Sequence, residues 1–345
     1  MVHVTVARQA VFAAAFTAAI ACGGYDSTSP NYPPVPSSED GLWTASAFNP
    51  AIFRLAPSQL LTDGTPTPAT SISTTSADLF NMNGIAFDTD GTMWVTSQDD
   101  STLVGFAPAA LAKSGSTPAT IVISSTAGSL SGPTSLAFDP QHRLWVSNSA
   151  NGTIVRFDRA QLATSGAPVP AVTIAGLGLP TGLAFDNAGS LWVADTRRRK
   201  IASFTPAQQA VSGFIAPSVV ISAVATSIVN PTGLAFDASG NLWFTNPDSR
   251  SVASFTQAQL AATGSPAPSV VVSSDGASLS VPVGLAFDAG GSLWVINAAG
   301  QLEKFATASL GATGAPAPSV RLKINDGTLF WSLAFWPKPA GLPVN

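Results

Sequence analysis

Short apolar runs alternate with polar, glycine-containing turns from residue 41 onwards, and one apolar phrase returns at a nearly constant interval. The phrase reads Gly-Leu-Ala-Phe-Asp or a close variant, and its copies begin at Gly84, Ser135, Gly182, Gly233, Gly284 and Ser332. An apolar residue followed by tryptophan opens this part of the chain and follows each of the first five copies, giving Trp43, Trp94, Trp145, Trp192, Trp243 and Trp294. These tryptophans are 51, 51, 47, 51 and 51 residues apart, a period typical of β-propeller blades.

Each repeat unit is predicted to contain four strands. In the fifth unit the expected strands are Val283–Asp288, Leu293–Asn297, Gln301–Phe305 and Pro318–Ile324, with a glycine turn between the first two. In the fourth unit, residues 256–264 begin with a polar residue and end at a glycine, which predicts one or two turns of helix. Four short strands per unit correspond to one propeller blade.

The two ends of the repeat are incomplete in complementary ways. Leu333-Ala334-Phe335 has no Leu-Trp strand after it, and Leu42-Trp43 has no first strand before it. Pairing the two fragments completes a sixth blade and removes the open edges of a linear array. We therefore predict an all-β fold, a single six-bladed β-propeller of four-stranded blades closed by N- and C-terminal strands that share one blade.

The repeat resembles the NHL, streptogramin-lyase and gluconolactonase-like group of six-bladed propellers, which share the TolB-like architecture. The residues that carry the resemblance are the phrases Pro-x-Gly-Leu-Ala-Phe-Asp and Gly-x-Leu-Trp-Val, as in Pro231–Asp237 and Gly240–Phe244. It covers about residues 41–336. The resemblance implies the fold, but a fold shared by many activities does not assign one.

The first residues predict export. Arg8, an apolar run over residues 10–21 and a small residue before Cys22 resemble a bacterial lipoprotein signal. We expect a signal over residues 1–21, a lipidated Cys22, a Pro/Ser/Gly-rich tether over residues 22–40 and the propeller over 41–345. The protein would then be anchored in the cell envelope at a periplasmic or extracellular face and touch the membrane through its lipid alone. The alternative is an ordinary secretory signal with an incidental cysteine.

Composition narrows the range of partners. Hydrophobic residues make up 46% of the chain and charged residues only 10%, with a net charge of −4. Because nucleic-acid binding usually requires a basic face, we expect no nucleic-acid partner. We expect a monomer.

The repeated tryptophans and aspartates have structural and functional interpretations. The tryptophans could stack on a ligand, but their constant register in apolar strands favours packing between blades. The aspartates could bind calcium, but each stands at a glycine turn with no second acid in the later copies, which favours backbone hydrogen bonds in the turn. They are Asp88, Asp139, Asp186, Asp237 and Asp288. We expect no metal ion and no cofactor.

The central channel is the candidate ligand site. First strands line the channel of a propeller, and the residue two places before Leu-Ala-Phe is Asn83, Thr134, Thr181, Thr232, Val283 or Trp331. Second strands end near the same face with Asn148, Asp195, Asn246 and Asn297. These positions predict a polar, nearly uncharged mouth that either binds a small molecule or only solvates the channel and satisfies backbone groups.

One basic cluster stands out in this charge-poor chain. Arg197, Arg198, Arg199 and Lys200 fall in the turn between the second and third strands of one blade. They are either a solvated turn or a surface that recognises an anionic partner.

The chemistry of the resembling enzymes is missing. Streptogramin lyases use histidines and a glutamate near the channel, and here the histidines are His3, in the signal, and His142, in a hairpin on the opposite face. Gluconolactonase-like enzymes hold a divalent cation with Glu, Asn and Asp. Asn83 matches that asparagine, but the glutamates Glu39 and Glu303 fall outside the channel positions.

Two functions are therefore left open. We expect a non-catalytic binding or scaffold propeller tethered to the cell envelope, with an unknown protein, glycan or small molecule at the channel face and no catalytic residue. The alternative is a divergent lyase or lactonase that uses Asp195 and the asparagines of the channel mouth, with or without a metal.

Overall fold

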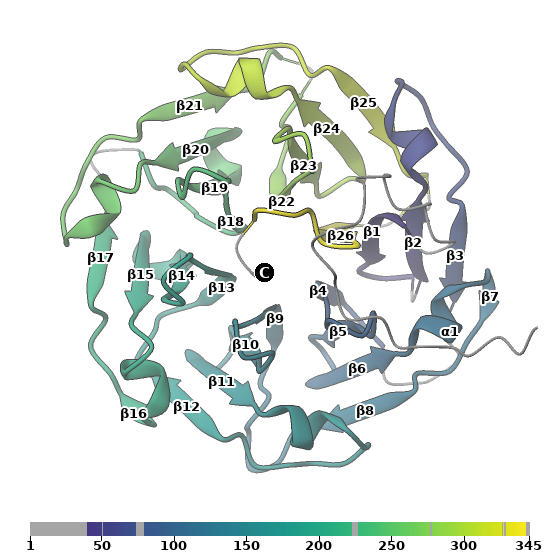
Figure 1. Cartoon of the computed structure of the whole chain (residues 1–345), viewed down its shortest axis with the longest axis vertical. Coiled ribbons are helices and arrows are strands. Elements are labelled where there is room, and N and C mark those ends of the chain that lie inside the picture. The colour runs from purple at the N-terminus through teal and green to yellow at the C-terminus, as the bar shows by residue number, and fades with distance from the viewer. Residues whose placement is uncertain are drawn as a thin grey trace, which may run out of the picture. The chain divides into compact units, whose positions relative to one another are not determined.

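The computed structural model describes residues 40–49, 51–73, 79–222, 227–276, 278–325, 327 and 329–342, which form a ring of sheets around a central axis (Figure 1). The ring lies within the compact unit Ser37–Asn345. The expected signal, Cys22 and the tether up to residue 39 lie outside the described residues. In the described part of the chain, none of the helices has the length and apolar character needed to cross a membrane.

Six four-stranded antiparallel sheets form the blades, which confirms the predicted six-bladed propeller. Blade 1 is built from β26 (Phe330–Trp336), β1 (Gly41–Ser46), β2 (Ala51–Leu55) and β3 (Thr70–Ser73). Blade 2 contains β4 (Met82–Phe87), β5 (Met93–Ser97), β6 (Thr102–Phe106) and β8 (Ile121–Ser124). Blade 3 contains β9 (Pro133–Phe138), β10 (Leu144–Asn148), β11 (Thr153–Phe157) and β12 (Val172–Ala175).

The remaining blades repeat this order from the channel outwards. Blade 4 contains β13 (Pro180–Phe185), β14 (Leu191–Asp195), β15 (Lys200–Phe204) and β17 (Val219–Ser222). Blade 5 contains β18 (Leu234–Phe236), β19 (Leu242–Asn246), β20 (Ser251–Phe255) and β21 (Val270–Ser273). Blade 6 contains β22 (Pro282–Phe287), β23 (Leu293–Asn297), β24 (Gln301–Phe305) and β25 (Val320–Lys323).

The two ends of the folded chain meet in blade 1, as predicted. Strand β26 is the innermost strand and pairs antiparallel with β1, with Leu42 opposite Phe335 and Trp43 opposite Ala334. The register shifts between Thr44 and Ser46, where the pairing is irregular. The last strand of the sequence therefore completes the first blade and closes the ring.

The tryptophans pack between blades, as their register predicted. The indole ring of Trp145 on β10 packs edge-on against Phe185 of the next first strand, with ring centroids 6.3 Å apart. Trp192 and Phe236 repeat the contact at 6.2 Å. Further copies with centroids 5.9–6.4 Å apart join Trp43 to Phe87, Trp243 to Phe287 and Trp294 to Phe335. Buried aromatic surface of this size holds neighbouring blades together.

The repeated aspartates order the turns between first and second strands. Asp186 is representative, since its Oδ1 accepts hydrogen bonds from the backbone N–H groups of Ala188 and Ser190 at 2.9 and 2.8 Å. Asp139, Asp237 and Asp288 do the same in their own turns. A carboxylate that accepts bonds from its own turn fixes the hairpin, as the sequence predicted.

The helical segments are short. Within residues 256–264 the structure has the 3-10 helix η6 (Gln259–Ala261), a single turn, which is the lower end of the one or two turns expected. Seven further short helices lie in the described turns and connections, η1 (Pro57–Leu60), α1 (Pro108–Leu111), η2 (Arg159–Leu162), η3 (Thr196–Arg198), η4 (Gln208–Ala210), η5 (Pro247–Ser249) and η7 (Thr307–Leu310).

A second set of bonds runs around the outside of the ring. In the segment before each outer strand, a glycine pairs in parallel with the outer strand of the preceding blade, as Gly166 does with Ile123. The residue before the glycine adds a side-chain bond, such as the Ser165 Oγ that accepts the Val122 N–H at 3.0 Å. The short strands β7 (Gly115–Ser116) and β16 (Gly213–Phe214) are two of these contacts. We call them rim bridges, and Gly64, paired with Leu322, links blade 1 to blade 6.

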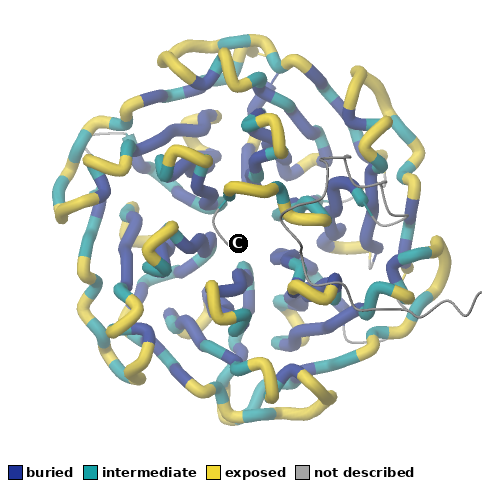
Figure 2. The backbone as a smooth tube through the Cα atoms, in the orientation of Figure 1, coloured by how far each residue is buried: buried dark blue, intermediate teal, exposed yellow. Residues whose placement is uncertain are grey.

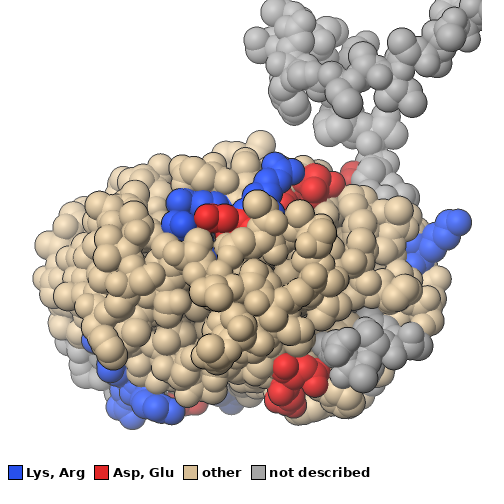
Figure 3. Space-filling model, turned by 90° about the horizontal axis from the view of Figure 1, so that it is seen from below, with Lys and Arg blue, Asp and Glu red and all other residues tan. Residues whose placement is uncertain are grey.

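The ring has two unlike faces. The hairpin face carries the turns between first and second strands, and it is also where β1 begins at Gly41 and β26 ends at Trp336. The opposite face, the collar face, carries the turns between second and third strands. Exposed residues gather in these turns and along the outer perimeter (Figure 2). Charged side chains gather mostly on the two faces, and the side of the ring seen in Figure 3 is nearly uncharged.

Candidate functional site

A cavity of about 540 Å³ occupies the centre of the ring and is lined by the first strands of all six blades. The glycines of the repeated phrase allow these strands to approach closely. A Cβ atom added at Gly182 would lie only 2.1 Å from the carbonyl oxygen of Thr232 in the next blade. The cavity has the size of a site for a small molecule.

The collar is the ring of six lining residues nearest the collar face. It consists of the six residues predicted from the repeat, Asn83, Thr134, Thr181, Thr232, Val283 and Trp331. The threonine hydroxyls also join blades, since Thr232 Oγ1 lies 2.7 Å from Thr245 Oγ1 and donates to the Val283 carbonyl at 3.2 Å. Asn83 donates to the Gln98 side chain at 2.9 Å. The polar collar side chains of Asn83, Thr134, Thr181 and Thr232 are therefore already hydrogen-bonded within the protein.

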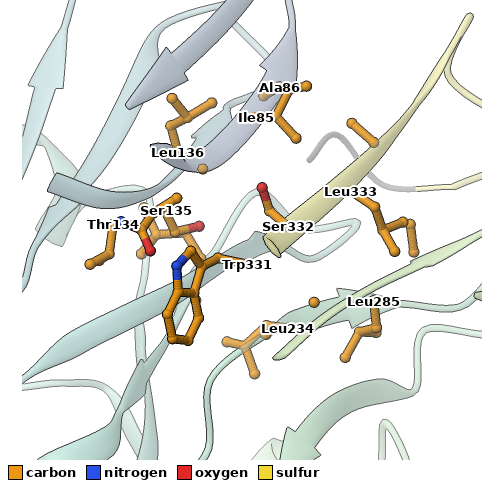
Figure 4. A pocket seen from close by; sticks show the side chains of 18 of the residues that line it. Ile85, Ala86, Thr134, Ser135, Leu136, Leu234, Leu285, Trp331, Ser332 and Leu333 are labelled. Carbon is orange, nitrogen blue, oxygen red and sulfur yellow. The ribbon is translucent and has the colours of Figure 1, made fainter. Parts of the chain in front are cut away.

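Next to the collar lies a ring of six aliphatic side chains, which we call the girdle. One comes from each first strand, at the leucine of the repeated phrase, and each is 4–7% exposed: Ile85, Leu136, Leu183, Leu234, Leu285 and Leu333. From the sequence, these residues were assigned no role at the site. Their constant position, two residues after each collar residue, could have shown that they share its face of the strand. The girdle makes the middle of the channel apolar and uncharged. A close view shows most of the girdle around the lumen (Figure 4).

Strand β26 breaks the sixfold pattern. Trp331 replaces the small collar residues of the other blades, and its ring extends into the space between the first strands (Figure 4). Its Nε1 and the Oγ of Ser332 are buried and have no hydrogen-bond partner in the described part of the protein. The collar is consequently narrowed on one side by an indole ring.

The predicted residues at the ends of the second strands do not line the cavity. Asn148, Asp195, Asn246 and Asn297 are at most 2% exposed. Both oxygens of Asp195 accept the Gly178 N–H, at 3.1 and 3.0 Å, and its Oδ1 also accepts the Leu179 N–H at 3.0 Å. Each asparagine likewise accepts backbone N–H groups of the loop that leads to its own first strand. These four side chains hold loops in place, and the structure brings only the collar residues together at the cavity.

The basic cluster lies in the turn around η3 on the collar face. Arg197, Arg198 and Arg199 are exposed, and Lys200 is half-buried at the start of β15. Arg198 Nη1 lies 3.4 Å from Asp195 Oδ2 and also donates to the Gly176 carbonyl. Arg199 has a φ of 52°, in the left-handed region, and ends the short helix. The turn therefore presents cations to solvent beside the channel mouth, as predicted for a turn at this position.

The other end of the cavity differs from the collar. Asp88, His142 and Lys338 line it at the hairpin face, and they are the ionisable residues among the described lining residues. His142 lies in the turn between β9 and β10, on the face where the sequence placed it. It nevertheless lines the cavity, so its expected distance from the channel is wrong. The cavity runs through the ring, so the turn reaches its lining. No group of three His, Cys, Asp or Glu able to hold a metal ion occurs among the residues described.

One family model matches the chain. It is the model described as SMP-30/Gluconolactonase/LRE-like region, and the match covers residues 35–227. None of the curated proteins matches the sequence.

Solved structures share the architecture at low identity. A chain of a nidogen/laminin complex is 16% identical with a TM-score of 0.56, over 85% of this chain and 96% of that one. A protein of unknown function from Bacteroides caccae is 11% identical with a TM-score of 0.56, over 83% and 99%. Streptogramin B lyase is 14% identical with a TM-score of 0.48, and the match spans 66% of this chain and 66% of the lyase. At such identities the likeness concerns the fold alone.

Proposed function

The chain belongs to the SMP-30/gluconolactonase/LRE-like family, and we propose that it is a non-catalytic binding propeller of the cell envelope that holds a small, largely apolar molecule in its central channel. The observation that carries this proposal is the girdle. Six aliphatic side chains around a cavity of about 540 Å³ offer burial to an apolar ligand. The collar hydroxyls, already bonded within the protein, favour a lining that is stable without a ligand.

The contacts of Asp195 favour binding over the alternative of a lyase or lactonase. A general base must reach the proton that it removes. Asp195 is 0% exposed, and its oxygens are engaged by the backbone N–H groups of Gly178 and Leu179. It would have to leave these bonds to reach a substrate in the channel. A divergent enzyme therefore has less support than a binding protein.

The envelope location rests on the first residues of the sequence. A lipidated Cys22 and a tether over residues 22–40 would join the propeller at Gly41, where β1 begins on the hairpin face. The collar face would then point away from the point of attachment. On that face, Arg197, Arg198 and Arg199 are exposed and fit an anionic glycan of the envelope as a second, docking partner.

The channel can be tested with Nile red, an uncharged dye whose fluorescence rises in apolar surroundings. The purified chain with Cys22→Ser, which cannot be lipidated, should bind the dye at one saturable site. Thr232→Trp places a second indole in the collar, and Leu234→Gln puts an amide into the girdle. Each should weaken dye binding by about tenfold or more.

The matched control is Leu61→Gln, because Leu61 is 70% exposed. It should leave dye binding unchanged. Dye binding that survives both channel substitutions, in variants that unfold at the wild-type temperature, would refute the channel as the ligand site.

A further inference from the structure

The two ends of the channel differ in charge, and this difference points to the kind of ligand. The collar contains Asn, Thr, Val and Trp and bears no ionisable group. The hairpin end contains Asp88, His142 and Lys338. Between them lies the uncharged girdle. The channel is therefore an apolar passage with ionisable groups at one end only.

Lys338 reaches the channel because the chain turns back over it after β26. Residues 337–342 follow the last strand, and Lys338, Pro339 and Leu342 line the cavity. Leu342 packs against the cluster that includes Leu285 and Phe287, on the neighbouring part of the ring. The segment runs along the edge of the channel opening near β22 (Figure 1, yellow). We call residues 337–342 the strap.

Among the described residues, the ammonium group of Lys338 forms no ion pair. Burial lowers the pKa of Lys338 below its ordinary value. Lys338 as a whole is exposed, and it lines the cavity at the edge of the channel opening. An unpaired ammonium at the edge of an apolar cavity is stabilised by an anion that enters the cavity.

The other charged groups at this end leave Lys338 available. Asp88 is 7% exposed, and its Oδ1 accepts bonds from the backbone N–H and the hydroxyl of Thr89. Arg143, the cation next to His142, is paired with Asp139 through Nε. Among the described lining residues, Lys338 is thus the cation without an ion-pair partner. His142 lines the same end of the cavity and adds a second nitrogen donor.

We propose that the channel ligand is an amphipathic carboxylate, such as a medium-chain fatty acid, an inference that rests on the proposed function. Its carboxylate would bind Lys338, and its alkyl chain would lie along the girdle. A first strand such as β22, six residues long, extends about 20 Å at about 3.3 Å per residue. An alkyl chain that follows it passes the girdle and reaches the collar. Lys338 and His142 supply the donors that a carboxylate accepts.

The test compares laurate with dodecanol, which has the same chain and no charge, by calorimetric titration of the unlipidated full chain. Laurate should bind about tenfold more tightly, the effect of one charge-assisted hydrogen bond. Lys338→Met should remove this difference, because it should lower the affinity for laurate and leave the affinity for dodecanol unchanged. Lys338→Arg should restore most of the difference. Lys113→Met is the control, since Lys113 is exposed and does not line the cavity.

The pH dependence provides a second readout. Laurate affinity should fall as the pH rises through the lowered pKa of Lys338, because the ammonium loses its proton, whereas dodecanol affinity should stay constant. Equal affinities of laurate and dodecanol, or a Lys338→Met chain that still prefers laurate, would overturn the carboxylate proposal and leave the binding channel intact. If the wild-type chain binds neither compound and also fails to bind Nile red, the proposed function itself is wrong.

Discussion

The indole nitrogen of Trp145 donates a hydrogen bond of 2.9 Å to Oδ2 of Asp139, so the turn of a blade is tied to the aromatic residue that packs against the next blade. The same pair recurs in three other blades, at 2.9–3.1 Å. Blade 2 departs from the pattern. There the Asp88 carboxylate accepts hydrogen bonds from Thr89 and lines the cavity, and Trp94 Nε1 is buried with no acceptor among the described residues. The repeated pair is thus lost in blade 2, whereas blade 3 keeps it although His142 of its turn also lines the cavity.

This difference predicts unequal costs for one substitution made in two blades. Trp145→Phe removes a hydrogen bond to a buried carboxylate together with part of the ring, whereas Trp94→Phe removes ring atoms alone. We expect Trp145→Phe to lower the free energy of unfolding by about 2 kcal/mol more than Trp94→Phe does. Urea unfolding of the two variants measures the difference. Equal losses would mean that the hydrogen bond contributes nothing to stability.

Removal of β26 should open the ring. Deletion of residues 330–345 takes away the strand that pairs with β1 and exposes Leu42, Trp43 and the edge of blade 1. The loss should exceed the roughly 0.5–3 kcal/mol of a point substitution and abolish cooperative thermal unfolding. Deletion of residues 337–345 alone is the control, because it keeps β26. A chain without β26 that melts like the full-length protein contradicts the shared blade.

Glu303 should make stability depend on pH. Its side chain on β24 is 3% exposed, and its Oε2 lies 3.4 Å from Arg321 Nε without a hydrogen-bond partner among the described residues. Burial raises its pKa from 4.5 to about 7, with the carboxylates of Asp275 and Asp63 adding to the rise and Arg321 opposing it.

Because the folded pKa is the higher one, the stabilisation is complete below about pH 4.5 and is lost as the pH rises to about 7. The free energy of unfolding should therefore fall across this range, by at most about 3 kcal/mol. Glu303→Gln, which cannot ionise, should flatten the profile in urea titrations. A wild-type profile that does not differ from that of the variant would mean that the pKa of Glu303 is the same in the folded and the unfolded chain.

The basic turn should matter for docking and not for folding. Replacing Arg197 and Arg199 with Ser should change the free energy of unfolding by less than about 1 kcal/mol, because exposed charges contribute little. Adding Arg198→Ser should cost more, because Arg198 lies 3.4 Å from the buried carboxylate of Asp195. The triple substitution should reduce co-sedimentation with an anionic envelope glycan. Raised salt should reduce co-sedimentation of the wild-type protein in the same way. Binding that persists after both changes would identify the turn as merely solvated.

Cys22 should carry the membrane anchor. With Cys22→Ser, radiolabelled palmitate should no longer be incorporated and the protein should be released in soluble form, because its one cysteine is gone. If the wild-type chain is never labelled, simple secretion replaces lipid anchoring. Lys113→Ser, on the exposed surface, controls for effects of substitution alone.

The repeat made most of the fold predictable. The Leu-Trp and Leu-Ala-Phe phrases reveal blade number, strand order and the shared blade, because each is repeated at one register and the two ends complement each other. The collar followed from the same register. Thr134, Thr181 and Thr232 could be placed because side chains two apart in a strand share a face.

The rest of the site depends on contacts between distant segments. The girdle residues are themselves core residues, 4–7% exposed and packed in the clusters between blades, so their pattern did not show that they also line the cavity. Asn246 was expected at the channel, but its Oδ1 is used by the N–H groups of Val229 and Asn230. The strap follows the last repeat and has no periodic partner, so nothing in the pattern placed Lys338 in the cavity.

The rim bridges also limit how copies of this protein can meet. An exposed outer strand offers free N–H and C=O groups to which a strand of another molecule can be added. Here the outer edge of each blade is occupied by the following one, and even blade 6 is covered at Leu322 by Gly64 of blade 1. A protein with so few charges has little electrostatic repulsion to keep its copies apart. Since each outer strand that the structure describes is covered in this way, the chain itself blocks edge-to-edge aggregation.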